Sequence, residues 1–245
     1  MKFVVRLKAA DDVKLAGGKG SSLARMITAG FRVPDGFVIT AAAKTMNDEL
    51  KDEVFAAFDK LGAQKVAVRS SALAEDGAED AWAGQMDTFL NVGRNNLIEA
   101  VQKCWRSAGS QRAKAYAEEK GLDAGCLAVV VQEMIDGDVS GVAFSVHPVT
   151  NNKNQVIIEA VKGLADKLVS GEITPDSYVA DKRTNEIISQ AAQNSNALLN
   201  QAQLSELSET AAKLEEYFGF PVDVEWTFAN GQLFILQSRP ITTLG

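Results

Sequence analysis

The chain has 245 residues, of which 46% are hydrophobic, and it carries a formal net charge of −7 at pH 7. This length allows one large domain or two small ones, each with a buried core. The acidic balance argues against a nucleic-acid groove, because phosphate backbones bind basic surfaces. The sequence has no apolar stretch long enough to cross a membrane, and its N-terminus lacks the apolar core of a signal peptide.

The two cysteines, Cys104 and Cys126, lie too far apart for a metal knuckle and are too few for a disulfide framework. We interpret both as reduced core residues, which is typical of a cytoplasmic protein. Composition therefore predicts a soluble, cytoplasmic, globular protein with no nucleic acid and no membrane among its partners.

Hydrophobic periodicity predicts an α+β chain. In the first half, a glycine-rich turn at residues 16–22 opens a helix that ends at Gly30, and further elements are expected as strands 3–7, 37–39, 66–71 and 86–92 and helices 41–61 and 97–120. In the second half, we expect strands 127–131, 141–146, 156–160 and 178–180, a helix 204–218 and a terminal hairpin. The pattern changes after Gly121, which predicts an N-terminal lobe, 1–121, and a C-terminal lobe, 122–245.

The glycine-rich segment Gly17-Gly18-Lys19-Gly20 is suited to binding an anion. Glycines let backbone N–H groups approach a phosphate, the start of a helix is electropositive, and Lys19 adds a point charge. The spacing is not that of a P-loop. A helix-entry turn with a surface lysine is the alternative interpretation.

A long polar loop separates the strand that carries Arg69 from a returning strand. Arg69 lies near the end of its strand, where a guanidinium can hold a phosphate through two parallel hydrogen bonds. The loop is rich in small residues that would let it fold over a triphosphate. Its length and composition favour a functional lid over an ordinary hairpin loop.

Two further segments invite a functional and a structural interpretation. The stretch Gln132-Glu133-Met134-Ile135 follows an apolar strand and could hold a flat base, although a plain strand and turn would have the same pattern. His147, the only histidine, precedes Pro148 in a turn-like segment. We interpret His147 as structural.

The C-terminal segment, residues 222–240, predicts a β-hairpin around Ala229-Asn230-Gly231-Gln232. Its register decides which side chains share a face, because a shift of one residue moves every side chain to the other face. A two-residue Asn-Gly loop would place Glu225 opposite Leu236. A three-residue, bulged loop would instead bring the polar side chains of the two strands together.

The bulged register is favoured because it also aligns apolar residues. It creates four cross-strand pairs: Asp223–Arg239, Glu225–Gln237, Trp226–Leu236 and Phe228–Phe234. One face then carries two carboxylates, an amide oxygen and a guanidinium, which suit Mg²⁺ and a phosphate. An exposed sheet face with an ion pair is the alternative.

The order of these segments resembles the N-terminal ATP-binding domain of the pyruvate phosphate dikinase and phosphoenolpyruvate synthase family, an ATP-grasp fold shared with rifampin phosphotransferases. The resemblance spans nearly the whole chain. The segments that carry it are 17–20, 33–37, 68–71, 83–92, 141–145, 174–178, 223–226 and 237–242.

The resemblance implies roles for individual residues. The residues implied to hold ATP phosphates and take part in catalysis are Lys19, Arg69 and Arg239. Those implied to line the nucleotide site or meet the adenine are Gly84, Thr88, Gln132, Glu133, Met134 and Ile135. The implied Mg²⁺ ligands are Glu225 and Gln237, with Asp223 in support.

The sequence also departs from the family pattern. The region between Thr40 and Lys65 is short, and Lys162–Asp166 differs from the usual Gly-Leu-Gly-Glu. The chain ends soon after Ile241-Thr242, before the family's swivelling domain with its phosphorylated histidine. The phosphohistidine is therefore expected on another domain or another chain.

The implied fold is an ATP-grasp fold of α+β class with two lobes that clamp ATP. The implied function is the first half-reaction of a dikinase, in which Mg-ATP is bound and its phosphoryl groups pass to a histidine, leaving AMP. Three alternatives remain open: a rifampin-type phosphotransferase, an ATP-grasp ligase, and a non-catalytic nucleotide-sensing module.

Overall fold

The computed structural model describes residues 3–72, 88–108, 127–169, 171–193 and 197–242. The chain divides into two compact units, Met1–Met134 and Ile135–Gly245. The division lies later than the boundary expected at Gly121, because strand β5 (Leu127–Glu133) pairs with two strands of the first unit. We describe each unit by itself.

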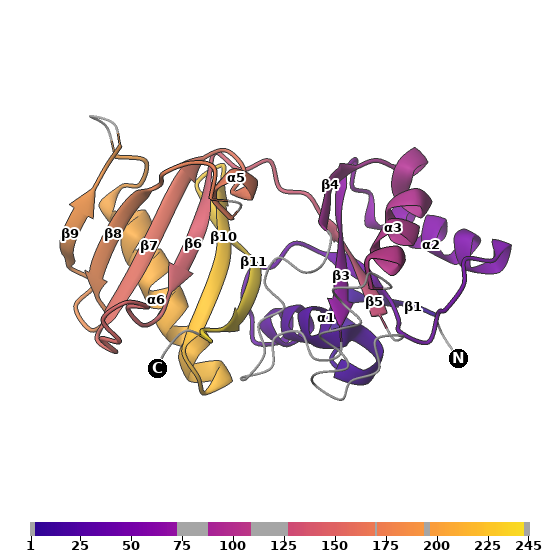
Figure 1. Cartoon of the computed structure of the whole chain (residues 1–245), viewed down its shortest axis with the longest axis horizontal. Coiled ribbons are helices and arrows are strands. Elements are labelled where there is room, and N and C mark those ends of the chain that lie inside the picture. The colour runs from indigo at the N-terminus through magenta and orange to yellow at the C-terminus, as the bar shows by residue number, and fades with distance from the viewer. Residues whose placement is uncertain (1–2, 73–87, 109–126, 170, 194–196, 243–245) are drawn as a thin grey trace. The chain divides into compact units, whose positions relative to one another are not determined.

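The first unit is built on a five-stranded antiparallel sheet (Figure 1). Its strands are, in spatial order, β1 (Val4–Arg6), β2 (Gly36–Ile39), β5, β3 (Val66–Ala72) and β4 (Thr88–Val92). Helix α1 (Val13–Thr28) packs against one face, and helices α2 (Asp48–Leu61) and α3 (Leu97–Ala108) cover the other. Short 3-10 turns, Leu7–Ala9 and Arg94–Asn96, precede α1 and α3.

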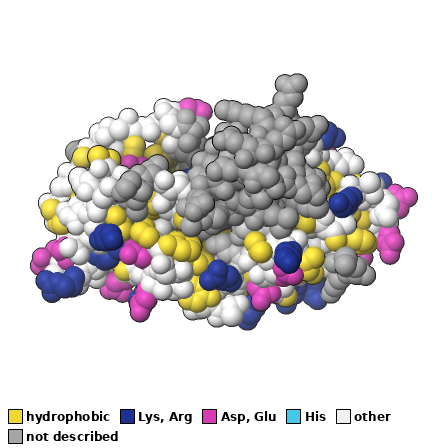
Figure 2. Space-filling view, turned by 60° about the horizontal axis from the view of Figure 1, so that its bottom comes forward, with side chains coloured by type: hydrophobic (Ala, Val, Ile, Leu, Met, Phe, Trp, Pro, Cys, Tyr) yellow, Lys and Arg dark blue, Asp and Glu magenta, His cyan; other side chains and the backbone are white. Residues whose placement is uncertain are grey.

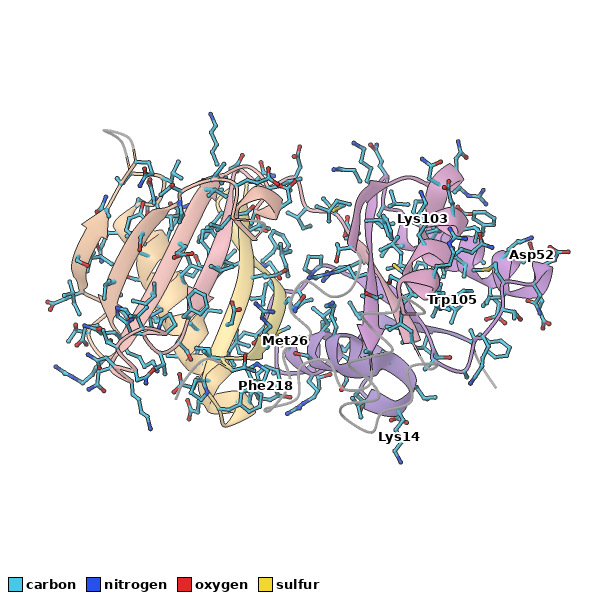
Figure 3. The ribbon with its side chains drawn as sticks, in the orientation of Figure 1. Lys14, Met26, Asp52, Lys103, Trp105 and Phe218 are labelled. Carbon is cyan, nitrogen blue, oxygen red and sulfur yellow. The ribbon has the colours of Figure 1, made fainter. Side chains whose placement is uncertain are left out.

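The face under α2 and α3 is the apolar core of the first unit. Alternate residues of the strands, such as Val66 and Val68, meet Val54 of α2 and Val101 of α3, all fully buried. Trp105 on α3 packs against the same cluster (Figure 3). Arg69 and Ser71 of β3 and Gln132 of β5 alternate with these residues and therefore lie on the opposite face, under α1.

The predicted helix 41–61 is shorter than expected and begins at Asp48. The Asn47 side chain accepts a hydrogen bond from the Leu50 backbone N–H at 2.9 Å, which caps the helix. Gly62 ends it with φ 73° in the left-handed region. Apolar spacing alone missed the cap, because the residues before Asn47 continue the hydrophobic pattern.

The glycine-rich segment lies within α1 and not before it. The helix begins at Val13, and Gly17 interrupts it with φ 71° and ψ 174°. This backbone conformation is strained for any residue with a side chain. The expected turn is thus a kink, and Gly18, Lys19 and Gly20 form the first turn of the second helical segment.

The second unit contains a six-stranded antiparallel sheet (Figure 1). Its strands are, in spatial order, β11 (Gln232–Pro240), β10 (Val222–Ala229), β6 (Val139–Phe144), β7 (Gln155–Lys162), β8 (Asp176–Asp181) and β9 (Ile187–Ala191). Helix α6 (Gln201–Phe218) packs on one face through Leu204, Leu207, Ala211 and Leu214. A short helix, α5, spans Asp166–Val169.

Strand β9 is an element that the sequence did not predict. It forms the edge of the sheet next to β8, and four of its five residues are exposed. Its sequence, Ile-Ile-Ser-Gln-Ala, does not alternate apolar with polar residues, so periodicity does not reveal it. The predicted strands and helices elsewhere in the described ranges are present, with bounds that differ by a few residues.

In the parts of the chain that the structure describes, no helix is long and apolar enough to cross a bilayer. Figure 2 shows Lys and Arg side chains interspersed with Asp and Glu side chains on the face in view.

Cys104 is a buried free thiol, as expected for a core residue, and Cys126 lies outside the described residues.

Candidate ATP-binding site

Four of the predicted site residues lie in the first unit on the side of its sheet that faces α1. Lys19 comes from α1, Arg69 from β3, Thr88 from β4 and Gln132 from β5. Thr88 is the direct cross-strand partner of Arg69, so their side chains share a face. The structure therefore brings together residues that are 113 positions apart in the chain, from Lys19 to Gln132.

Lys19 and Arg69 are cations held largely out of solvent. Their exposed fractions are 5% and 7%, values that are rare for charged residues. Lys19 Nζ donates a hydrogen bond to the backbone oxygen of Ser70 at 3.0 Å, next to Arg69. Arg69 Nη1 donates to Gln132 Oε1 at 3.4 Å, a long bond. These bonds orient two positive charges on one face.

Two backbone N–H groups of the segment predicted to meet the adenine already make hydrogen bonds within the first unit. The backbone N–H of Glu133 donates to Asp35 O at 2.9 Å, and that of Met134 donates to Lys65 O at 3.1 Å. Their carbonyl groups and the backbone of Ile135 are what remains to meet a base. Gly84, the other predicted nucleotide contact, lies outside the described residues.

The hairpin of the second unit has the predicted polar pairs. Asp223 lies opposite Arg239 and Glu225 opposite Gln237, as the bulged register required. The predicted loop is wrong, however, because Ala229 pairs with Gln232 and leaves a two-residue Asn-Gly turn. Asn230 and Gly231 have φ of 50° and 72°, as such a turn requires.

A β-bulge between Glu225 and Trp226, and not the loop, sets the polar register. Leu236 is the extra residue of β11, so Trp226 pairs with Ile235 and Phe228 with Leu233. The predicted apolar pairs with Leu236 and Phe234 are therefore wrong. The two effects cancel at the polar end of the hairpin, where the polar pairs are those expected.

Asp223 is the most buried charged group of the hairpin. Arg239 Nε and Nη2 both donate to its Oδ2 atom, at 2.9 and 2.7 Å. Its Oδ1 atom is buried and has no hydrogen-bond partner among the described residues. Burial raises the pKa of the Asp223 carboxyl above its usual value, although the charge of Arg239 acts in the opposite direction.

Glu159 is a member of the site that the sequence did not reveal. It lies on β7, opposite Val142, which in turn lies opposite Glu225, so Glu159 shares the polar face of the hairpin. Burial, followed by repulsion from Asp223, raises the pKa of the Glu159 carboxyl. No local pattern marks this residue, because its proximity arises from pairing of strands distant in the sequence.

The oxygen atoms of this face fit an ion that is shared with a ligand. Asp223, Glu225 and Gln237 offer hard carboxylate and amide oxygens, and Asp223 Oδ1 lacks a hydrogen-bond donor among the described residues. Within those same ranges, no three His, Cys, Asp or Glu side chains form a metal site by themselves. Mg²⁺ is commonly held by one or two carboxylates together with substrate phosphates, which fits this donor set.

His147 makes hydrogen bonds within its own turn. Its Nδ1 atom accepts hydrogen bonds from the backbone N–H groups of Val149 and Thr150, at 3.3 and 3.4 Å. These bonds stabilise the turn after β6. They occupy the Nδ1 atom.

Comparison with known proteins assigns the chain to a family. The family described as the pyruvate phosphate dikinase AMP/ATP-binding domain matches residues 42–245. The chain therefore belongs to this family of ATP-binding domains. The predicted α+β class is confirmed by the two sheets and their helices, and the family agrees with the ATP-grasp fold that the resemblance implied.

Two relatives illustrate the assignment. A probable phosphoenolpyruvate synthase of Methanocaldococcus jannaschii is 33% identical over 320 aligned positions, covering 100% of this chain and 27% of that protein. The phosphoenolpyruvate synthase of Pyrococcus furiosus is 30% identical and is covered to 43%, with 96% of this chain aligned. The chain thus spans less than half the length of these relatives.

Among solved structures, D-alanyl-alanine synthetase A from Vibrio cholerae is similar with a TM-score of 0.48 and 10% identity. The likeness covers 92% of this chain and 55% of that chain. A likeness this distant adds nothing to the family assignment.

Proposed function

We propose that the chain binds Mg-ATP and carries out the first half-reaction of a dikinase. Phosphoryl groups pass from ATP to a histidine on a separate domain or chain, and AMP remains. The observation that carries the proposal is the hairpin, in which Glu225 faces Gln237 and Asp223 faces Arg239. Membership in a family of AMP/ATP-binding domains and the names of the relatives support it.

The first unit would contribute the two cations that bind the ATP phosphates, Lys19 and Arg69, which we call the phosphate grip. Lys19 and Arg69 are buried cations with fixed orientation, and such charges stabilise a transferring phosphoryl group without reorganising during the reaction. Thr88 would line the nucleotide site beside Arg69, its cross-strand partner. Gln132, with backbone groups of Glu133, Met134 and Ile135, would meet the adenine. Gly84 is proposed from the resemblance alone.

The second unit would contribute the metal ligands. Glu225 and Gln237 would hold Mg²⁺, and Asp223 would support them through its buried Oδ1 atom. When bound, Mg²⁺ neutralises phosphate charge. Arg239 is already oriented by Asp223, and its guanidinium would hold a phosphate. No nucleophile is required from these residues, because their work is positioning and charge neutralisation.

The partner follows from the reaction. A phosphohistidine domain, in the same polypeptide or in another, would receive the phosphoryl group. We also propose a cytoplasmic location, because ATP is the substrate and Cys104 is a free thiol.

Radiolabel transfer from ATP tests the proposal. We expect Mg²⁺-dependent ATP binding by the chain alone but very slow AMP formation, since water is a poorly positioned substitute for a histidine. Adding a compatible phosphohistidine domain should raise AMP formation and label that domain. A ligase of this fold would form ADP instead, and a sensor would form neither product.

The His147→Ala variant is the matched control. In the parent, the Nδ1 atom of His147 accepts two backbone hydrogen bonds within its own turn. The variant should therefore support transfer to the added domain as the parent does. Acid-labile label on the chain alone that disappears in His147→Ala would contradict the proposal. The protein would then be its own histidine kinase.

A further inference from the structure

Ser71 on β3 makes two hydrogen bonds to the kinked part of α1. Its hydroxyl donates to the backbone oxygen of Ala16 at 2.7 Å and accepts from the backbone N–H of Gly20 at 3.1 Å. Ser71 is fully buried. In an uninterrupted helix the N–H of Gly20 would bond directly to the oxygen of Ala16. The hydroxyl of Ser71 therefore stands between the two groups that the kink has separated.

This arrangement is a helix cap supplied by another strand. Gly17 occupies the N-cap position of the second helical segment, and Gly20 is the third residue inside it. An N-cap side chain normally accepts a bond from this third N–H, but glycine has no side chain. Ser71 takes over that bond, which fixes where the second segment begins.

The close approach requires glycine at position 17. A Cβ atom there would lie 2.3 Å from both the oxygen and the Oγ atom of Ser71. Ser71 therefore occupies the space that a side chain at position 17 would fill. The kink and the serine depend on each other, and together they tie α1 to β3.

We infer that Ser71 is a positioning residue for the phosphate grip. Ser71 fixes where the helical segment that carries Lys19 begins, so that the Lys19 ammonium meets the Ser70 oxygen. Ser71 lies two residues from Arg69, on the same face of β3. This inference rests on the proposed function, in which Lys19 holds an ATP phosphate. Ser71 itself is fully buried and acts through Lys19.

The test compares ATP with adenosine, which lacks the phosphates, by titration calorimetry in the presence of a chelator. The chelator removes the contribution of the metal ligands. We expect Ser71→Ala to weaken ATP binding by about tenfold, the factor that corresponds to the loss of one or two hydrogen bonds. Adenosine affinity should stay within about twofold of the parent.

A double variant shows whether Ser71 acts through Lys19. If it does, Ser71→Ala should have little further effect in a Lys19→Ala background, because the positioned group is already gone. Val101→Ala is the matched control, since it removes fully buried volume under the opposite face of the sheet. It should lower Tm and leave the ratio of ATP to adenosine affinity unchanged.

The outcomes separate the inference from the proposed function. An unchanged affinity ratio in Ser71→Ala, or fully additive effects in the double variant, overturns the inference alone. Unchanged ATP affinity in Lys19→Ala overturns both. If Ser71→Ala does not fold, Ser71→Cys keeps the volume with a weaker donor and should lower the ratio by a smaller factor.

Discussion

At the scale of single residues, the site depends on charges that are buried and already oriented. Arg69 is held next to Gln132 and Thr88, and Arg239 next to Asp223. A guanidinium is planar and can make two parallel bonds to a phosphate, whereas an ammonium is a point charge. The geometry of these two side chains should therefore matter as much as their charge.

Conservative substitution tests this expectation. Arg69→Lys and Arg239→Lys should each lower the rate of phosphoryl transfer to a phosphohistidine domain by about 10-fold to 100-fold, the range of one or two charge-assisted hydrogen bonds. Transfer rates at saturating Mg-ATP measure the effect. Arg94→Lys is the control, because Arg94 pairs with Asp59 on the surface and should not alter transfer. Parental rates in both site variants would show that neither guanidinium contacts the phosphates.

Acidic residues of the hairpin face predict a pH dependence of stability. The pKa of Glu159 is raised from its ordinary 4.5, so between that pH and the raised pKa the folded state holds a proton that the unfolded state has lost. Stability contributed by this group is therefore lost as pH rises through that window. Asp223, whose pKa is also raised, acts in the same direction.

The Glu159→Gln variant should remove the loss of stability that Glu159 causes as pH rises. Its Tm should match the parent near pH 4.5 and exceed it by roughly a few degrees near pH 7. Glu99→Gln is a control of opposite sign, because Lys103 lowers the pKa of Glu99 and the pair stabilises the fold once Glu99 is ionised. Thermal melts across pH 4.5 to about 7.5 would measure both. A Glu159→Gln curve parallel to that of the parent would contradict the assignment.

At the scale of elements, different parts of the hairpin reverse the chain and align its polar pairs. The Asn230-Gly231 turn closes the loop, while the bulge at Leu236 aligns Glu225 with Gln237. A bulge leaves one residue of a strand without a cross-strand partner and so absorbs a mismatch in length. The alignment of these polar pairs therefore depends on Leu236 being the extra residue and not on the turn.

Two deletions of one residue in β11 should have opposite results. Deleting Leu236 would leave a regular ladder with the same polar pairs, so Mg²⁺-dependent ATP binding should persist with a modest fall in Tm. Deleting Ser238 would move Arg239 to the position opposite Val224, on the buried α6 side, where an unpaired charge costs several kcal/mol. Tm and ATP titrations measure both. Loss of binding in the Leu236 deletion would show that the bulge has a role beyond alignment.

At the scale of the whole molecule, the proposed ligands are divided between the two compact units. Lys19 and Arg69 belong to the first unit, and Glu225, Gln237 and Arg239 to the second. Residues that act on one ligand couple energetically, whereas residues that act on different ligands contribute independently. The division therefore makes a prediction about pairs of substitutions.

A double-mutant cycle between the units tests whether they act on one ATP. Lys19→Ala and Glu225→Ala should each weaken Mg-ATP binding by about tenfold or more, as expected for lost charged contacts. Glu225→Ala should act mainly on the Mg²⁺-dependent part, and the double variant should lose less than the product of the two factors. Additive losses, or equal Mg²⁺ dependence in Glu225→Ala and the parent, would contradict the proposal that the two units act on one ATP.

The sequence predicted the fold class because alternation of apolar and polar residues predicts strands. It predicted the pairing of Asp223 with Arg239 through a three-residue loop, whereas a two-residue turn and a bulge at Leu236 together produce that pairing. Patterns failed where structure depends on distant pairing or on a single cap. The position of β5 in the first sheet, the exposed strand β9, the cap at Asn47 and the approach of Glu159 to the hairpin are all of this kind.

Trp226 follows Glu225 in β10 and gives the hairpin an optical signal of its own. Its indole is fully buried on the α6 side, and a Cβ atom at Gly141 would lie 2.8 Å from its ring. Buried indoles in apolar surroundings fluoresce at shorter wavelengths than exposed ones. A chain in which Trp82 and Trp105 are replaced by Phe would therefore report Mg²⁺-dependent changes in the hairpin through the emission of Trp226, with no added dye and no acceptor domain.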